Sequence, residues 1–246
     1  MLGGRWKPLQ YFFKDHLYTD LFVVCGDDAR CFVKNDSPLS AFAGTLRLSA
    51  LNVSNSAVIE INSTTVSLGK GAGAATWLCA GAGSPYQECT SWAAVLQPLA
   101  AAPTGTVLIT ELLSGSNNAV VYSSFELLAT PAAMMGNMPK ATVTAHVASA
   151  AASRADGSSV SITVDADGAA LFVGLSTAAH GRFSRNFFVM AKGQTTVDFL
   201  PFGELDLATL KATLGATCKK EEEGEEEERE VVVVAGAISK SPFYKT

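Results

Sequence analysis

The side chains that could do chemistry are scattered along the 246 residues of the chain. General acid–base catalysis by carboxylates needs two of them held in reach of the same substrate. Outside one acidic run the glutamates share no motif and stand in strand-like or loop segments, at Glu60, Glu88, Glu111, Glu126 and Glu204. The histidines His16, His146 and His180 are far apart and lack the spacing of metal ligands. The sequence therefore predicts no catalytic residue and no metal site.

Other binding motifs are also missing from the sequence. The segment GKGAGA at 69–74 lacks the Gly-Lys-Ser/Thr ending of a phosphate loop, so we interpret it as a flexible loop, and no GxSxG elbow occurs. Lysine and arginine are scattered and form no basic face for nucleic acid. The valine run VVVVAGAI at 231–238 is too short to span a membrane and predicts a buried strand. We expect no cofactor, no nucleic acid and no membrane partner.

The five cysteines contain no CxxC pair, which argues against a zinc site. Two β-rich runs, LFVVC at 21–25 and RCFVKN at 30–35, flank the turn GDDA and predict a hairpin. Cys25 and Cys31 stand on either side of that turn. We expect them to face each other across the two strands and to form a disulfide.

Aromatic residues gather in the Gly- and Ala-rich segment 69–105, which we expect to be loop plus one short helix. Exposed aromatic faces could stack on a sugar, whereas buried ones would fill the gap between a loop and the core. Both alternatives stay open for three residues, Trp77, Tyr86 and Trp92.

The formal charge of −5 depends on one segment. The run EEEGEEEERE at 221–230 holds eight glutamates and one arginine, a net −7, so the remaining residues sum to +2. Like charges in such a run cannot pack together, and we interpret 219–230 as a solvated loop inserted in a hairpin.

Short strands separated by Gly, Asn, Ser and Pro turns recur along most of the chain and predict an all-β fold of two immunoglobulin-like sandwiches. The first sandwich is expected over 19–139, including separate strands at 57–61 and 65–68. The second is expected over 140–246, with a strand-like end at 210–215. The junction is placed near Pro139.

A single amphipathic helix is expected over 1–18, before the strands. Its apolar residues Trp6, Leu9, Phe12 and Phe13 follow helical spacing, with charged residues between them. We expect this apolar face to stay exposed, unless the helix folds back on a sandwich, and to promote self-association.

Three stretches carry motifs of a known family in that family's order: GGRWKPLQYFF at 3–13, CFVKNDS at 31–37 with GTLRLS at 44–49, and GRFSRNFFVMAKGQTTVDFLPF at 181–202. Together they resemble the C-terminal region of a β-mannosidase of glycoside hydrolase family 2. GGRWKPLQYFF at 3–13 is similar to the final helix of that family's catalytic (β/α)8 barrel. CFVKNDS at 31–37 with GTLRLS at 44–49 is similar to the start of an intermediate sandwich. GRFSRNFFVMAKGQTTVDFLPF at 181–202 resembles the signature of the last immunoglobulin-like domain, in which family members usually carry an acidic residue at the position of Arg185.

The resemblance implies an accessory role for this chain. Intact family members hydrolyse terminal non-reducing β-D-mannose residues with two barrel glutamates, the acid/base one following an asparagine, and no Asn-Glu dipeptide occurs here. We therefore expect a chain that is inactive alone and whose partner is the catalytic barrel of the same or a split polypeptide, with mannose-containing glycans as a further partner. The alternatives are a carbohydrate-binding module and a non-catalytic Ig-like interaction protein.

Two smaller expectations follow from these motifs. The resemblance implies a lysosomal or secretory location, although no signal peptide is recognisable, and two sequons make Asn52 and Asn62 candidate glycosylation sites on turns. In the third stretch, Gly181 ends a loop, Arg182 offers a donor fork to carbonyls or a carboxylate, and Asn186 closes a turn. Phe183 and Phe187 then bury this corner.

Overall fold

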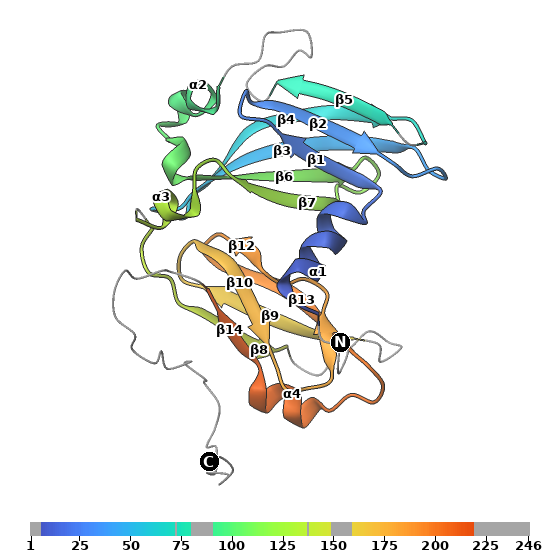
Figure 1. Ribbon diagram of the computed structural model, residues 1–246, viewed down its shortest axis with the longest axis vertical. Coiled ribbons are helices and arrows are strands. Elements are labelled where there is room, and N and C mark those ends of the chain that lie inside the picture. Colours follow the sequence, from blue (N-terminus) through green and yellow to red (C-terminus); the bar gives the residue numbers. More distant parts are fainter. Residues whose placement is uncertain (1–5, 72, 80–90, 137, 149–158, 219–246) are drawn as a thin grey trace.

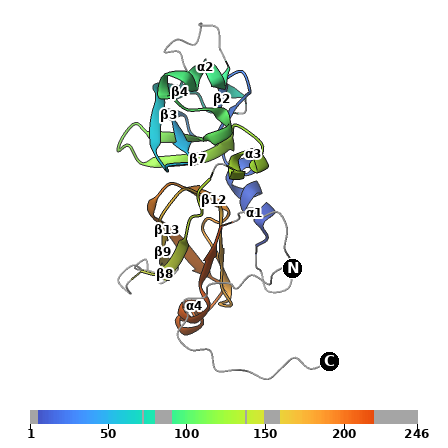
Figure 2. The ribbon, with the colours of Figure 1, turned by 90° about the vertical axis from the view of Figure 1, so that its left-hand side faces the viewer.

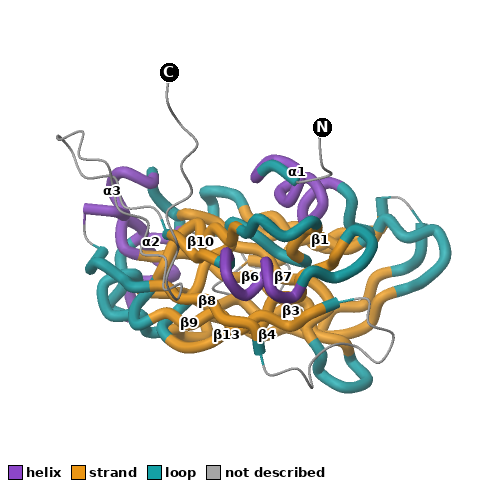
Figure 3. Tube along the Cα trace, turned by 90° about the horizontal axis from the view of Figure 1, so that it is seen from below, coloured by secondary structure: helices purple, strands orange, loops and turns teal. Residues whose placement is uncertain are grey.

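The computed structural model describes residues 6–71, 73–79, 91–136, 138–148 and 159–218. Its strands form two β-sandwiches placed end to end (Figures 1 and 2). Strands also make up most of the trace when it is seen from below, along the long axis, and the helices are short (Figure 3). The predicted all-β fold is confirmed. The acidic run and the valine run, at 221–238, lie outside the described residues, as does Tyr86.

The first sandwich packs a three-stranded sheet, in the order β1-β2-β5, on a four-stranded sheet, in the order β4-β3-β6-β7. Every pair of neighbouring strands is antiparallel. The strands are β1 Leu21–Cys25, β2 Arg30–Asn35, β3 Phe42–Asn52, β4 Val58–Leu68, β5 Ala74–Cys79, β6 Thr106–Ser114 and β7 Val120–Leu127. Alternate residues point inward, and the buried side chains between the sheets include Val33, Leu46, Leu48, Leu108 and Leu112.

Two predictions in this half are corrected. The strands expected at 57–61 and 65–68 are one continuous strand, β4, because the polar residues Asn62–Thr64 are tolerated on an edge strand with one solvated face. The 69–105 segment contains strand β5 as well as helix α2, Trp92–Leu96, and the 3-10 turns Gln97–Leu99 and Pro103–Gly105. Helix α2 begins at the Ser91 side chain, which accepts a hydrogen bond from the backbone N–H of Ala94.

The second sandwich has sheets ordered β12-β10-β14 and β11-β13-β9-β8. Its strands are β8 Val143–Val147, β9 Val160–Ala166, β10 Ala170–Ser176, β11 Gly181–Phe183, β12 Phe188–Met190, β13 Gly193–Pro201 and β14 Gly215–Thr217. The strand-like reading of 210–215 is wrong for most of that segment. Asp206 caps a helix there, α4 Leu207–Thr213, by accepting from the backbone N–H of Thr209, and β14 follows it.

A third apolar cluster joins the two sandwiches. Leu51 and Val107 of the first sandwich and Leu171 of the second are fully buried in it. Helix α3, Pro131–Gly136, adds Met134, whose side chain is also fully buried. Helix α3 and the N-terminal helix lie on opposite sides of this junction (Figures 1 and 2), so the two sandwiches are held together by packing on several elements.

The N-terminal helix has two parts. Helix α1 spans Pro8–Phe12, with Pro8 in its first turn, and it continues as a π-helical segment over Phe13–Leu17. No helix in the described part of the chain is long and apolar enough to cross a membrane.

The hairpin β1–β2 brings Cys25 and Cys31 into register as cross-strand partners, and their sulfur atoms are bonded. Because the closed loop is short, with a sequence separation of six, we expect the bond to add only about 2 kcal/mol to the free energy of unfolding on the chain-entropy model. Urea unfolding of C25S/C31S against the oxidised protein measures the difference. Peptide mass spectra of unreduced protein that contain both thiols free would contradict the pairing.

Candidate functional site

The corner between β11 and β12 is organised by one buried amide. The Asn186 side chain, 8% exposed, accepts from the backbone N–H groups of Leu175 and Phe187 at 2.7 and 3.0 Å, and it donates to the Leu175 carbonyl at 2.9 Å. Asn186 therefore ties the corner to β10, a different strand, in addition to closing its own turn. Phe187 has a φ of +57°, which the surrounding bonds must hold in place.

Gly181 is required by close packing in the same corner. A Cβ atom at this position would lie 2.6 Å from the Leu200 carbonyl oxygen and inside the contact distance of the Phe199 ring. Phe183 packs edge-on against Phe199, with ring centroids 5.5 Å apart, and is buried. These contacts bring two of the predicted motif residues, Gly181 and Phe183, against strand β13.

Arg182 does not provide the expected donor fork to an oxygen acceptor among the described residues. Its guanidinium instead stacks over the Trp6 ring, 4.2 Å from the centroid. A guanidinium plane over an indole face is a favourable cation–π contact. Trp6 is thus folded back on the second sandwich, where it also packs edge-on against Tyr11.

Helix α1 is docked through a residue that the sequence pattern did not single out. Tyr11 is 3% exposed in the core of the second sandwich, and its hydroxyl accepts from the backbone N–H of Phe183 at 3.2 Å. Burial raises the pKa of the Tyr11 phenol, against the hydrogen bond from Phe183. Leu9 and Phe12 remain 58% and 53% exposed, so the predicted apolar face is only partly covered.

The π-helical segment reaches both sandwiches. Lys14 pairs with Asp15 and donates to the Ser184 carbonyl in the second sandwich. His16 lies 3.4 Å from the Ser124 hydroxyl on β7 of the first sandwich and stacks beside Phe12. Burial lowers the pKa of His16, an effect that Arg185 strengthens and Asp15 opposes.

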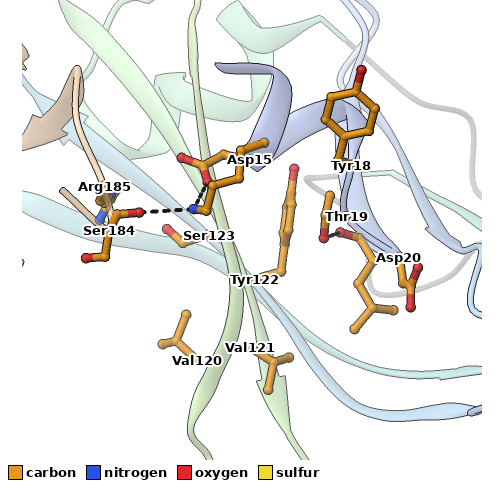
Figure 4. Close-up of a pocket in the computed structure, with 12 residues that line it drawn as sticks. Asp15, Tyr18, Thr19, Asp20, Val120, Val121, Tyr122, Ser123, Ser184 and Arg185 are labelled. Atoms are coloured by element: carbon orange, nitrogen blue, oxygen red, sulfur yellow. Dashed lines mark hydrogen bonds and ion pairs between the residues drawn. The ribbon is translucent and has the colours of Figure 1, made fainter. Parts of the chain in front are cut away.

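A cleft of about 680 Å³ opens beside this segment. Figure 4 shows Tyr122 and Ser123 of β7 near its centre, Val120 and Val121 below them, Tyr18 and Asp20 on one side, and Ser184 and Arg185 on the other. Strand β7 is the edge of its sheet, and among the described strands only β6 pairs with it. The cleft therefore exposes an apolar strand edge with a cation at one end.

Arg185 is a cation of this cleft for which the described residues provide no direct ion pair, whereas Lys14 pairs with Asp15. Its guanidinium packs over the Phe188 ring, 4.9 Å from the centroid. Burial lowers the pKa of this guanidinium, while the more distant Asp15 and Glu111 raise it. A carboxylate is the group that best matches such a partly desolvated guanidinium.

The glutamates of the described segments do not form a carboxylate pair suited to catalysis. Glu111 binds Arg47 at 2.7 and 2.9 Å, and Glu126 accepts from the backbone N–H of Cys25 at 3.0 Å, with its pKa raised by burial. Glu111 and Glu126 lie opposite Ser123 and Leu108 in the ladder, so they project from opposite faces of the sheet. Glu60 is exposed on β4 and Glu204 is exposed in a loop, while Glu88 lies outside the described residues.

Of the three candidate sugar-binding aromatics, Trp92 is the one whose side chain lies within the described part of the structure, and Tyr86 lies outside it. Trp92 is 6% exposed in the first core, and its indole N–H donates to the Gly26 carbonyl at 2.9 Å, so its ring offers no face to a sugar. Trp77 lies in β5. A role for Trp92 in sugar contact is therefore corrected to a packing role.

The two sequons occupy different local structures. Asn52 ends β3 at a turn and its side chain accepts from Ser54, whereas Asn62 lies within β4 and not on a turn as expected. His146 pairs loosely with Asp165, and His180 lies against the Phe202 carbonyl. Glycosylation of Asn52 and Asn62 stays a prediction.

We predict that Asn186→Ala lowers the free energy of unfolding by about 2–4 kcal/mol, because each buried backbone group left unpaired costs about 1–3 kcal/mol. Urea unfolding measures this loss. A control is Asn117→Ala, which removes one hydrogen bond in an exposed hairpin turn. Equal, small losses in both variants would contradict the role of Asn186.

We predict that stability falls as the pH drops below 6.5. The pKa of His16 in the folded state is depressed below its ordinary value of 6.5, so the unfolded chain binds the proton more readily in this range. This contribution is complete above pH 6.5 and is lost as the pH falls through the folded-state pKa. Thermal melts of His16→Gln should lose this part of the slope, whereas His180→Gln, at an exposed site, should keep it; identical slopes in both variants would contradict the prediction.

Comparisons with known proteins agree with this architecture. Residues 138–218 match the Ig-fold domain model named Ig_mannosidase. In structure, the chain resembles the β-D-mannosidase of Dictyoglomus thermophilum, with a TM-score of 0.61 at 14% sequence identity, over 87% of this chain and 23% of that one. It also matches the exo-chitosanase CsxA of Amycolatopsis orientalis, with a TM-score of 0.49 at 16% identity, over 84% and 26%.

The chain thus spans about a quarter of the length of these two enzymes. A search among curated proteins finds no match by sequence. The similarity to the β-D-mannosidase supports the fold of both sandwiches, and the domain match covers the segment that contains the Asn186 corner. Residues 138–218 are an Ig-fold domain of the mannosidase family.

Proposed function

We propose that this chain is a non-catalytic accessory part of a β-mannosidase-like glycosidase and supports a catalytic (β/α)8 barrel. The observation that carries the proposal is the arrangement of helix α1. Tyr11 and Trp6 dock one side of it on the Ig-fold domain, while Leu9 and Phe12 leave an apolar strip on the other side. A helix that is anchored on one face and apolar on the next is suited to bridge two packed bodies.

The placement of the carboxylates is consistent with a supporting role. Retaining glycosidases need two carboxyl groups about 5–5.5 Å apart. Glu111 is engaged by Arg47 and Glu126 projects from the opposite face of the sheet, so these two cannot act as such a pair. By resemblance, the intact enzyme would hydrolyse terminal non-reducing β-D-mannose residues with groups supplied by its barrel.

A binding role for sugars is less favoured than the supporting role. Trp92 is buried, and no aromatic platform is formed by the described residues of the 69–105 segment. The partner we propose is therefore the barrel of the same or a split polypeptide, and not a free glycan.

Two measurements test the proposal. The chain alone should hydrolyse p-nitrophenyl β-D-mannoside at the uncatalysed rate, and saturable hydrolysis that is lost in E111Q or E126Q would overturn it. Co-expressed with a β-mannosidase barrel from the same genome, the chain should co-purify with it and raise the temperature at which its activity is lost.

The double variant L9D/F12D should abolish that co-purification, because it places two charges in the apolar strip. Leu39→Asp is the matched control, since Leu39 is 87% exposed in the loop between β2 and β3. Equal capture of the barrel by both variants, or no capture by the unmodified chain, would contradict the proposed role of α1.

A further inference from the structure

The cleft beside the π-helical segment combines exposed apolar side chains with charged ones. Val120 and Val121 of β7 line it and are 48% and 50% exposed. Tyr18, which is 81% exposed, stands on one side of the cleft, and Arg185 lies on the other (Figure 4). Exposed apolar side chains that gather in a cleft with a polar rim mark a site for a partner.

Side chains, and not the backbone edge of β7, determine what this cleft can bind. Leu113 pairs with Val120 and Leu112 pairs with Tyr122, so Val121 is an extra residue without a partner in the ladder. A bulge of this kind twists an edge strand and disfavours the addition of a further strand. The chemistry of the partner is therefore set by the charged and apolar groups that line the cleft.

Arg185 gives the cleft its preference for an acidic group. Its guanidinium is half-buried, and the described residues provide it with no ion pair. The two carboxylates whose charges act on it are already engaged. Asp15 pairs with Lys14. Glu111 pairs with Arg47. A further carboxylate, supplied by a partner, would form a charge-assisted and bidentate contact with Arg185 in a partly desolvated site.

The N-terminal helix connects this cleft to the surface on which the barrel is proposed to dock. Leu9 and Phe12 form the exposed apolar strip, and Leu17 and Tyr18 at the end of the helix are 62% and 81% exposed. Phe12 and Tyr18 are about 9 Å apart along the helix axis, at about 1.5 Å per residue. Tyr18 also lines the cleft. A single folded body that covers the strip therefore also reaches the cleft.

We propose that the cleft is a second contact site for the catalytic barrel and binds a barrel segment that carries an aspartate or a glutamate. The carboxylate pairs with Arg185, and apolar side chains beside it cover Val120 and Val121. Asp20, on the opposite side of the cleft, repels an acidic group and so sets the direction in which the segment lies. This inference rests on the proposed accessory function and adds to it the chemistry of the partner.

Charge variants of Val121 test the sign of the charge that the partner brings. Val121→Asp and Val121→Lys remove the same exposed side chain and place opposite charges in the cleft. With a carboxylate in the cleft, V121K should bind the purified barrel about tenfold more tightly than V121D in titration calorimetry. The difference should shrink in about 1 M salt, which screens exposed charges. Equal affinities, or tighter binding by V121D, would overturn the proposal.

The matched controls for this pair are Val58→Asp and Val58→Lys. Val58 is also 50% exposed on an edge strand, β4, but it does not line the cleft. V58D and V58K should therefore bind the barrel alike. A difference as large as that between V121D and V121K would show a general effect of charge on binding and would contradict a specific site at Val121.

Arg185→Gln tests the named contact. It should weaken barrel binding about tenfold, because the carboxylate loses its charged partner. Lys211→Gln is the control, since it removes one positive charge from an exposed residue of α4 in the same sandwich. Equal affinities of R185Q and K211Q would contradict the role of Arg185, and urea unfolding checks that both variants are folded.

A peptide titration of the chain alone separates this inference from the proposed function. The probe is acetyl-Val-Glu-Val-amide, and the control is the same peptide with glutamine in place of glutamate. The glutamate peptide should saturably shift the amide resonances of Val121, Ser123 and Arg185, and the glutamine peptide should not. Absence of these shifts would contradict the preference of the cleft for a carboxylate.

The combined outcomes identify which idea fails. Barrel capture that is lost in L9D/F12D but equal in V121D and V121K would overturn this inference alone. Peptide binding without any capture of the barrel would contradict the accessory function and, with it, the barrel as occupant of the cleft. Self-association that V121D and V121K change in opposite directions would assign the cleft to a second copy of the chain and would also overturn the proposal.

Discussion

The relative position of the two sandwiches depends on the apolar cluster between them. Domains of one chain usually move relative to each other unless their interface is large and apolar. Here Leu51 and Leu171 meet from opposite sides, and Met134 of α3 fills the space beside them with no exposed surface. The cleft and the docking of the N-terminal helix both use residues of both sandwiches, so they require this junction to be fixed.

The hydrogen bonds of Asn186 fix the corner between β11 and β12, which carries Arg182 and Arg185. A single amide satisfies three backbone groups of β10 and its own turn, which is how a buried polar side chain specifies one arrangement of a loop. The two arginines of this corner make different contacts. Arg182 stacks on Trp6 and secures the helix, whereas Arg185 lines the cleft with its charge unpaired among the described residues. One corner therefore both secures the N-terminal helix and lines the cleft.

Much of the fold could be predicted from local patterns, and the site could not. The bounds of β1 and β2 were predicted correctly because alternating β-rich residues flank a clear turn, Gly26–Ala29. Strand β5 was missed, since its small residues Ala74 and Ala75 carry no β signal, and α4 was missed because the cap Asp206 lies outside the apolar pattern. Tyr11 escaped notice because it does not belong to the set Trp6, Leu9, Phe12 and Phe13 on which the apolar face was based, although it is the buried residue of α1. The cleft joins positions 14–21, 120–123 and 184–185, a combination that only the tertiary fold reveals.

The contact between Tyr11 and Phe183 joins residues 172 positions apart, which has a consequence for synthesis. Long-range contacts form late because a long loop must close before they contribute. On the ribosome, the first helix emerges long before its acceptor strand exists, so its apolar residues remain without their native cover while the first sandwich folds. The nascent chain therefore passes through a period in which this helix is open to chaperones or to another folded body, and the emergence of strand β11 with Phe183 closes that period.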